Sequence, residues 1–242
     1  MTNPVTYSRS GTISRIVMDD GKVNVMSIGM LDALHAAFDE AERDKMVVVL
    51  TGRDNTFSAG FDLKVFTSGS ANEMYTMLKA GAELALRVLS FPTPVVAACN
   101  GNAYPMGAFL ILSADLRIAA QGPYKIGMNE VAIGLTVPQF GIEVARQRLT
   151  PAYFSRSVMT GEMFAPPEAV TAGFFDRTVP PPDLDAAADQ AAEALSRINL
   201  PAHAATKWRA RGPTIKAIRA AIDAEITLDY AEKRVASRNA RA

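Results

Sequence analysis

The sequence contains 242 residues, and its 25 Lys and Arg residues balance its 25 Asp and Glu residues. A chain of this length buries enough surface to form one substantial core without a disulfide or a structural metal. Its basic residues are scattered, which argues against binding to nucleic acid or to an anionic membrane. The single Cys99 excludes an intramolecular disulfide, and because no Cys or His cluster accompanies it, we expect no metal site.

Membrane segments and hydrolase triads are also disfavoured. Residues 1–15 contain no apolar run typical of a signal peptide, and no segment approaches the roughly 20 apolar residues that span a bilayer. We therefore expect a cytoplasmic protein that does not enter membranes. His35 and His203 both lie in segments typical of helical surface, so a serine or cysteine triad has no plausible base.

The first half of the chain alternates between strand and helix patterns. Residues 12–18 are predicted to form a short strand, and Asp19-Asp20-Gly21 a turn. A helix follows near residues 28–44, with an apolar face formed by Met30, Leu31, Leu34, Phe38 and Ala41. A second helix and three buried strands are expected at residues 72–90 and at 46–50, 94–99 and 116–119. This order predicts an α/β fold in which crossover helices connect parallel strands.

The character of the sequence changes after Thr150. Strand patterns end, alanine becomes frequent, and prolines as far as Pro213 separate short helical segments. We therefore divide the chain into a core over residues 1–150 and a helical region over residues 151–242, with roles in oligomerisation and as a lid. The last helix has an apolar stripe that either packs on its own subunit or contacts a second subunit or a ligand; it consists of Ile215, Ile218, Ile222 and Ile226.

The first segment that carries chemistry is TFSAGFDLK, at residues 56–64. It follows the strand predicted at 46–50, and the small residues before Gly60 allow the backbone to approach a ligand. Asp62 is suited to cap the helix that follows, and the N–H groups exposed at such a turn favour a developing negative charge. Taken alone, a strand-to-helix turn of this kind is commonplace.

The second segment is NGNAYPMGAF, at residues 100–109, after the strand predicted at 94–99. Pro105 has no N–H and presets the first helical turn, so the next donors, those of Met106 and Gly107, point out of a helix N-terminus. Two such turns after two strands of one sheet could bring their donors to a single oxygen atom.

Together these segments resemble the crotonase superfamily of enoyl-CoA hydratases and isomerases. FSAGFDLK and NGNAYPMG are followed by ADLRIA and IGMNE, in an ordered set that begins near VNVMS and continues to Pro138. The resemblance implies a spiral of repeated ββα units with a helical C-terminal region. It also implies an acyl-CoA thioester as substrate, so that coenzyme A enters with the substrate and no separate cofactor is expected, and a homotrimer or homohexamer.

Matched position by position, the resemblance assigns one oxyanion donor to the backbone N–H of Phe61. The second donor is that of Met106 or, alternatively, Gly107. Removing a proton beside a thioester carbonyl puts negative charge on its oxygen, and each preorganised donor there contributes ~2.7–4 kcal/mol. Because the donors are backbone groups, Phe and Met side chains are acceptable at these positions.

The acid and base residues decide the reaction. Hydratases of the family use two glutamates: Glu130 matches one of them, whereas Phe109 occupies the position of the other. Adding water requires one group to activate water and another to deliver a proton, so the loss of one carboxylate disfavours hydration. Moving a double bond from position 3 to position 2 requires one base that faces both carbons. The sequence around Glu130 is similar to that of mitochondrial short-chain 3,2-enoyl-CoA isomerases, so isomerase is the leading interpretation.

The remaining assignments concern binding. The resemblance assigns coenzyme A contacts to Lys22, Val25, Met26, Ala59, Gly60, Asp62 and Leu63. Phe109 is expected to form a wall of the acyl pocket, and the residues considered for an acyl tunnel are Met74, Met77, Leu78 and Leu84. Basic candidates for the coenzyme phosphates are Lys22, Lys64, Lys207 and Arg211.

Alternatives to the isomerase stay open at this point. One is a hydratase of fatty-acid β-oxidation in which another group replaces the missing acid. The other is a non-catalytic acyl-CoA-binding protein that kept the oxyanion cradle, which Phe109 at the place of a hydratase carboxylate suggests. Separately, Glu130 could be a salt-bridged surface residue.

Overall fold

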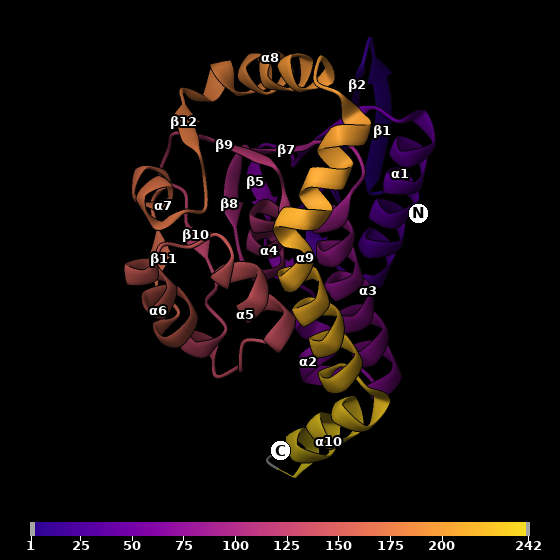
Figure 1. The fold of residues 1–242 in the computed structure, drawn as a ribbon. Helices are drawn as coiled ribbons and strands as arrows, with labels where there is room; N and C mark the ends of the chain where they lie inside the picture. The colour runs from indigo at the N-terminus through magenta and orange to yellow at the C-terminus, as the bar shows by residue number, and fades with distance from the viewer. Residues whose placement is uncertain (1–2, 241–242) are drawn as a thin grey trace.

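The computed structural model describes residues 3–240 and has an α/β fold with helices around three sheets (Figure 1). The largest sheet has the strand order β1-β2-β4-β7-β9-β12. Its strands are β1 (Val5–Ser10), β2 (Ile13–Met18), β4 (Val47–Thr51), β7 (Val95–Cys99), β9 (Leu116–Ala120) and β12 (Arg177–Val179). β1 and β2 form an antiparallel hairpin, and all other neighbours are parallel. The predicted parallel arrangement is therefore confirmed.

Two smaller sheets lie beside it. One has the order β11-β10-β8-β5, and the other pairs β3 with β6. Their strands are β3 (Val25–Met26), β5 (Asn55–Ser58), β6 (Gly60–Phe61), β8 (Gly101–Ala103), β10 (Ile126–Gly127) and β11 (Met163–Phe164). Most are too short to produce a recognisable sequence pattern, which is why they were not predicted.

The spiral arises because successive strands enter different sheets. β4 leads into β5, β7 into β8 and β9 into β10, and each pair contributes one strand to the large sheet and one to the small sheet. Val48 lies opposite Val95 in the large sheet, and Asn55 lies opposite Gly101 in the small one. A Cβ on Gly101 would collide with the Asn55 backbone, so this close approach requires glycine. The repeat confirms the predicted crotonase-like spiral of ββα units.

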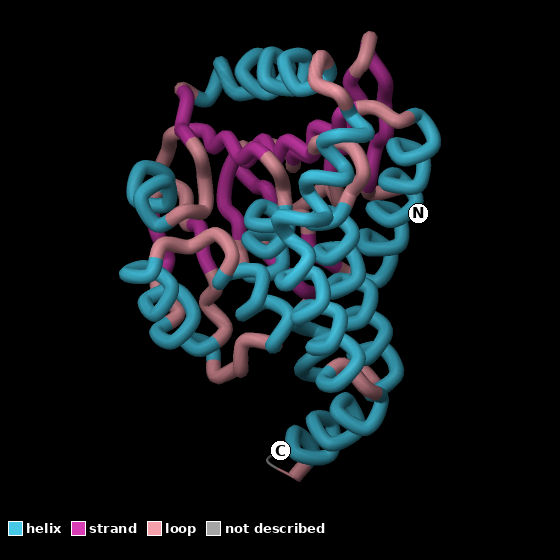
Figure 2. Tube along the Cα trace, viewed as in Figure 1, coloured by secondary structure: helices cyan, strands magenta, loops and turns pink. Residues whose placement is uncertain are grey.

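Helices cover both faces of the six-stranded sheet (Figures 1 and 2). α8 (Leu184–Ser196) lies on one face, where its alanines and Leu184 pack on valines of β4 and β7. The larger core on the other face includes α1 (Ile28–Asp44), α3 (Ala71–Ser90) and α4 (Pro105–Ser113). α1 and α3 match the two predicted helices, and all five residues of the predicted apolar face of α1 are buried.

The C-terminal region is mainly helical, as predicted. Its helices, together with the one that precedes Thr150, are α5 (Gln139–Arg146), α6 (Pro151–Thr160), α7 (Pro166–Ala172), α8, α9 (Leu200–Glu225) and α10 (Leu228–Asn239). The expectation that strands end at Thr150 is wrong, because β11 and β12 pair with β10 and β9. Both are too short to show an alternating pattern.

Pro213 was expected to separate two helices, and it instead lies inside α9. Proline removes one helical hydrogen bond, but tertiary packing of the apolar stripe compensates for it. Ile215, Ile218 and Ile222 are buried where α9 packs on α3 and α5. These three residues therefore pack on their own subunit, whereas the fourth residue of the stripe, Ile226, lines the cavity described below. No helix within residues 3–240 has the length and apolar composition needed to cross a membrane.

Candidate active site

The two segments predicted to carry the chemistry, at residues 56–64 and 100–109, lie side by side where β5 and β8 of the four-stranded sheet end. Ser58 at the end of β5 lies opposite Ala103 at the end of β8, and the Tyr104 N–H donates to the Ser58 carbonyl at 2.9 Å. A Cβ placed on Gly60 would lie 3.7 Å from the backbone nitrogen of Met106. The turn at residues 59–61 therefore faces the N-terminus of α4 directly.

Local sequence explains both turns. Gly60 has φ +84°, a conformation that other residues adopt only with strain. Asp62 accepts a hydrogen bond from the Lys64 N–H at 3.0 Å and so caps α2 (Leu63–Ser68), as predicted. Pro105 is the first residue of α4. The N–H groups of the first turn of a helix have no acceptor within the helix, and here no side chain caps them either.

The loop at residues 20–26 holds the first turn in place. The Ala59 N–H donates to the Val23 carbonyl at 2.9 Å, and β3 pairs with β6 through Val25 and Met26. Asn24 is fully buried, and its side-chain amide donates to the backbone carbonyls of Met18, Thr56 and Phe57. The loop predicted to contact coenzyme A therefore lies next to the first turn, with Lys22 exposed and the Met26 side chain in the core.

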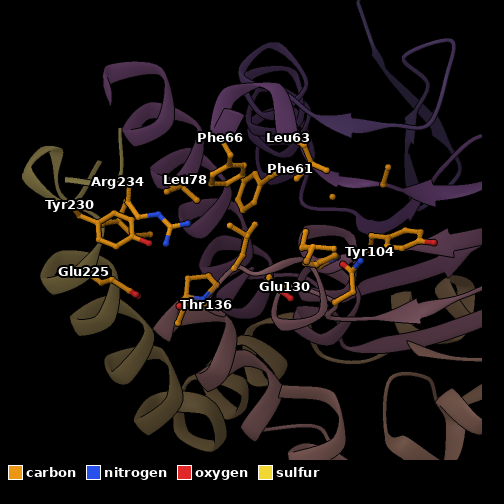
Figure 3. Close-up of a pocket in the computed structure, with 18 residues that line it drawn as sticks. Phe61, Leu63, Phe66, Leu78, Tyr104, Glu130, Thr136, Glu225, Tyr230 and Arg234 are labelled. Carbon is orange, nitrogen blue, oxygen red and sulfur yellow. The ribbon is translucent and has the colours of Figure 1, made fainter. Parts of the chain in front are cut away.

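A cavity of about 270 Å³ opens beside the two turns (Figure 3). Its walls are mostly apolar, and they come from both turns, from the segment at 129–138 and from the C-terminal helices. The lining residues are Ala59, Gly60, Phe61, Leu63, Phe66, Leu78, Tyr104, Pro105, Asn129, Glu130, Ile133, Leu135, Thr136, Pro138, Glu225, Ile226, Tyr230 and Arg234. Five of the residues predicted for the site, Ala59, Gly60, Phe61, Leu63 and Glu130, thus meet at one cavity.

Glu130 is the most unusual side chain of this cavity. Its residue is only 6% exposed, and its Oε2 atom has no hydrogen-bond partner among the described residues. Burial raises the pKa of this carboxyl from 4.5 to about 7. A tight turn presents it, because the Glu130 carbonyl accepts hydrogen bonds from Ile133 at 3.1 Å and Leu135 at 2.8 Å. The alternative of a salt-bridged surface residue is therefore wrong.

Phe109 does not line this cavity, which corrects the expectation that it forms a wall of the acyl pocket. It is fully buried on α4, and its ring packs edge-on against Phe140, with 5.3 Å between the ring centroids. Its ring also fills the space above Gly141, where an added Cβ would lie 2.5 Å from it. Every residue of α4 from Met106 to Ser113 is buried, so this helix has no polar face. The local sequence therefore does not reveal in which direction the Phe109 side chain points.

Some of the other residues predicted for the site line the cavity, and others are buried away from it. Met106 and Gly107 lie in the first turn of α4. The Met106 side chain is buried in the core, and a Cβ added to Gly107 would lie 2.9 Å from the Ser58 Cβ. Of the four residues considered for an acyl tunnel, Leu78 lines the cavity. The other three, Met74, Met77 and Leu84, are buried and absent from the lining.

Two of the basic candidates for the coenzyme phosphates are structural. The Lys207 ammonium is buried 2.6 Å from the Asp115 carboxylate, and Arg211 lies 3.1 Å from the same carboxylate. These contacts attach α9 to the loop before β9. The interpretation of Lys207 and Arg211 as phosphate ligands is therefore wrong, because both already neutralise the Asp115 carboxylate.

The prediction missed several residues of the cavity lining. Tyr104 and Asn129 lie inside the recognised motifs, and their neighbours could have drawn attention to them. Tyr230 and Arg234 come from α10, far along the chain from the motifs, and they reach the cavity only because the fold brings α10 back over it. Within residues 3–240, no cluster of three His, Cys, Asp or Glu side chains is placed to hold a metal ion.

Two strand-to-helix turns that meet over an apolar cavity, beside a buried carboxyl, define an enzyme-like site of the crotonase fold. The family model described as enoyl-CoA hydratase/isomerase matches residues 8–239. The chain therefore belongs to the enoyl-CoA hydratase/isomerase family, whose members process acyl-CoA thioesters.

Relatives with both activities are similar to this chain. A probable enoyl-CoA hydratase of Bacillus subtilis is 31% identical over 179 residues, which cover 71% of this chain and 67% of the relative. One protein of Mycobacterium tuberculosis has been solved under both descriptions. As an enoyl-CoA isomerase it is 44% identical, with a TM-score of 0.88 and coverage of 92% of this chain and 97% of that one. As a probable enoyl-CoA hydratase it is 43% identical, with a TM-score of 0.91 and coverage of 99% and 100%. A solved enoyl-CoA hydratase of Mycobacterium ulcerans is 45% identical, with a TM-score of 0.89 and coverage of 96% and 99%. The reaction must therefore be argued from the site itself.

Proposed function

We propose that the protein is a 3-enoyl-CoA to 2-enoyl-CoA isomerase in which Glu130 is the only base. The observation that carries the proposal is one buried carboxyl in the cavity lining: among the described residues, Glu130 is the only buried carboxyl that lines the cavity, and its Oε2 lacks a hydrogen-bond partner. Its pKa of about 7 leaves a useful fraction as carboxylate near neutral pH and keeps the conjugate acid able to return a proton.

The proposed reaction begins with the thioester carbonyl oxygen between the two turns. The backbone N–H of Phe61 donates from one side, and that of Met106, or alternatively Gly107, donates from the other. Hydrogen bonds to the loop at residues 20–26 hold the first turn, and Pro105 at the start of α4 fixes the second. These donors therefore need little reorganisation when charge develops on the oxygen.

The proton then moves within the cavity. The Glu130 carboxylate removes a proton from C2 of the 3-enoyl chain, and the electron pair delocalises into the thioester to give a dienolate. The Glu130 carboxylic acid returns the proton to C4, the double bond shifts to C2–C3, and the carboxylate is restored. No water is consumed, so one carboxyl group that reaches both carbons suffices.

The same site is poorly equipped for hydration. Hydration requires a second acid or base near the first, and Phe109, at the corresponding position, is apolar and packed in the core. Glu225 also lines the cavity, but it lies away from Glu130, and its Oε2 accepts a hydrogen bond from the Gln139 N–H at 2.6 Å. Isomerisation is therefore the reaction that the available groups support best.

The experiment incubates the purified protein with 3-hexenoyl-CoA and follows the absorbance of the conjugated 2-enoyl thioester. We expect turnover by the native protein and loss of it in Glu130→Gln. No turnover by the native protein, or full turnover by the variant, would contradict the proposal. Acyl-CoA binding without turnover of any thioester would instead support the non-catalytic alternative.

The oligomeric state predicted from the family resemblance, a homotrimer or homohexamer, is part of this proposal. Val131, Ile133 and Met159 lie on neighbouring elements, η1 (Val131–Ile133) and α6, and all three are exposed although they are apolar. Burial of such side chains in a subunit contact is favourable. Light scattering coupled to size-exclusion chromatography tests this directly, and a monomer would contradict it.

A further inference from the structure

The end of the cavity remote from Tyr104 is polar, although its middle is apolar. Arg234, Tyr230 and Glu225 lie together at this end, whereas Glu130 and Tyr104 lie toward the opposite end (Figure 3). Phe61, Phe66 and other apolar side chains line the space between. An acyl chain whose thioester lies between the two turns would therefore meet charged and hydroxyl groups at its far end.

Arg234 is held in this position by the fold. It lies one turn after Tyr230 on α10, so both side chains project from the same face of that helix. The next turn of α10 is fixed by Arg238, whose guanidinium donates to the backbone carbonyls of Phe66 at 3.3 Å and Gly69 at 2.9 Å. The cation is therefore presented by an anchored helix.

The guanidinium of Arg234 has no ion-pair partner among residues 3–240. Its nearest acidic neighbour in the lining, Glu225, is directed elsewhere, because its carboxylate accepts the 2.6 Å hydrogen bond from Gln139 in the first turn of α5. The partial positive charge at a helix N-terminus offsets a carboxylate in this position. A half-buried guanidinium that faces an apolar cavity loses hydration without a compensating partner.

Resting on the isomerase function proposed above, we infer that the preferred substrate carries a carboxylate at the far end of its acyl chain. A guanidinium presents a planar set of donors that matches a carboxylate, and the Tyr230 hydroxyl supplies one more donor beside it. A chain that ends in a methyl group would leave Arg234 facing hydrocarbon. The substrate class is thus an ω-carboxyacyl-CoA whose chain spans the apolar middle of the cavity.

The test compares pairs of saturated acyl-CoA thioesters of equal chain length that end in either a methyl group or a carboxylate. Saturated thioesters cannot isomerise, so their dissociation constants, measured by calorimetry, report on this site even if the proposed isomerase activity fails. At the best-fitting length, we expect the native protein to bind the carboxylate form about tenfold or more tightly, since one charge-assisted pair supplies that much.

The variant Arg234→Met should remove this preference, and Arg234→Lys should retain part of it. Lys233→Met is the matched control, because Lys233 is the preceding cation on α10, is exposed and pairs with Asp229 at 2.7 Å outside the cavity. This control should keep the preference of the native protein.

Two results would overturn the inference. One is equal affinity of the native protein for both members of every pair. The other is an equal loss of affinity for both members in Arg234→Met, which would assign Arg234 to the coenzyme moiety that the two thioesters share. Loss of turnover on 3-enoyl thioesters with the carboxylate preference intact would instead contradict only the proposed isomerase function.

Discussion

Replacement of Glu130 by Gln should abolish turnover and at the same time stabilise the protein at alkaline pH. The amide keeps the volume of the side chain but cannot accept the C2 proton, so we expect kcat/KM for 3-hexenoyl-CoA to fall by about 10²–10⁴-fold. The native protein should gain activity as pH rises through an inflection near 7, where the carboxyl ionises.

The effect on stability follows from the same raised pKa. Between 4.5, the ordinary value, and about 7, the folded protein holds a proton that the unfolded chain has released. The free energy of unfolding of the native protein therefore falls with rising pH across this window, by a total of about 3 kcal/mol from the raised pKa. Below the window the carboxyl is protonated in both states, and above it the folded state must hold a buried charge.

Glu130→Gln removes this pH-dependent loss. We expect its stability relative to the native protein to increase by up to about 3 kcal/mol between about pH 4 and about pH 8, measured by urea denaturation at several pH values. Glu193→Gln, which changes an exposed carboxylate on α8, should show neither effect. Retention of native turnover in Glu130→Gln, or a stability difference that does not vary with pH, would refute the assignment of Glu130 as a buried base.

Three further substitutions test the surroundings of the site. Phe109→Glu restores the carboxylate of the hydratases but places it in the core against Phe140. We expect the free energy of unfolding, measured by urea denaturation, to fall by several kcal/mol, and no hydratase activity to appear. A stable variant that hydrates 2-enoyl-CoA would contradict this. Gly81→Ala places a methyl group 2.5 Å from the Phe61 ring. It should lower the free energy of unfolding by about 1–3 kcal/mol and raise KM most for long acyl chains. Unchanged kinetics would show that the Phe61 ring does not shape the cavity. Asp115→Asn leaves the buried Lys207 and the half-buried Arg211 without their counter-charge and should cost about 3–5 kcal/mol, with turnover unchanged in the fraction that stays folded. A loss below about 1 kcal/mol would mean that the cluster is well solvated.

The sequence predicted those parts of the fold that local patterns encode. The periodic face of α1 and the β-branched run of β4 are long enough to be recognised, and both are present as expected. β10 and β11 contain two residues each, so their existence depends on pairing with distant strands rather than on any local preference. The helix break expected at Pro213 was wrong for a related reason, because the packing of α9 on its own subunit outweighs the local effect of proline.

The candidate site also contains residues that local sequence predicts and residues that only the tertiary fold brings into place. Gly60, Asp62 and Pro105 act through backbone conformation and capping, which sequence reveals, and they shape the two turns as expected. The direction of a buried side chain is decided by its neighbours, so Phe109 was placed in the pocket although it packs on α5. Arg234 had no local signal at all, since only the return of α10 over the cavity brings it to the site.

The most direct test of the central claim is the ratio of two activities in one preparation of the native protein. Isomerisation of 3-hexenoyl-CoA and hydration of 2-hexenoyl-CoA are measured side by side, the first from the conjugated absorbance and the second from formation of 3-hydroxyhexanoyl-CoA. With Glu130 as the only buried carboxyl that lines the cavity among the described residues, isomerisation should exceed hydration in kcat/KM by at least about 10²-fold. Hydration at an equal or greater kcat/KM would contradict the single-carboxylate account.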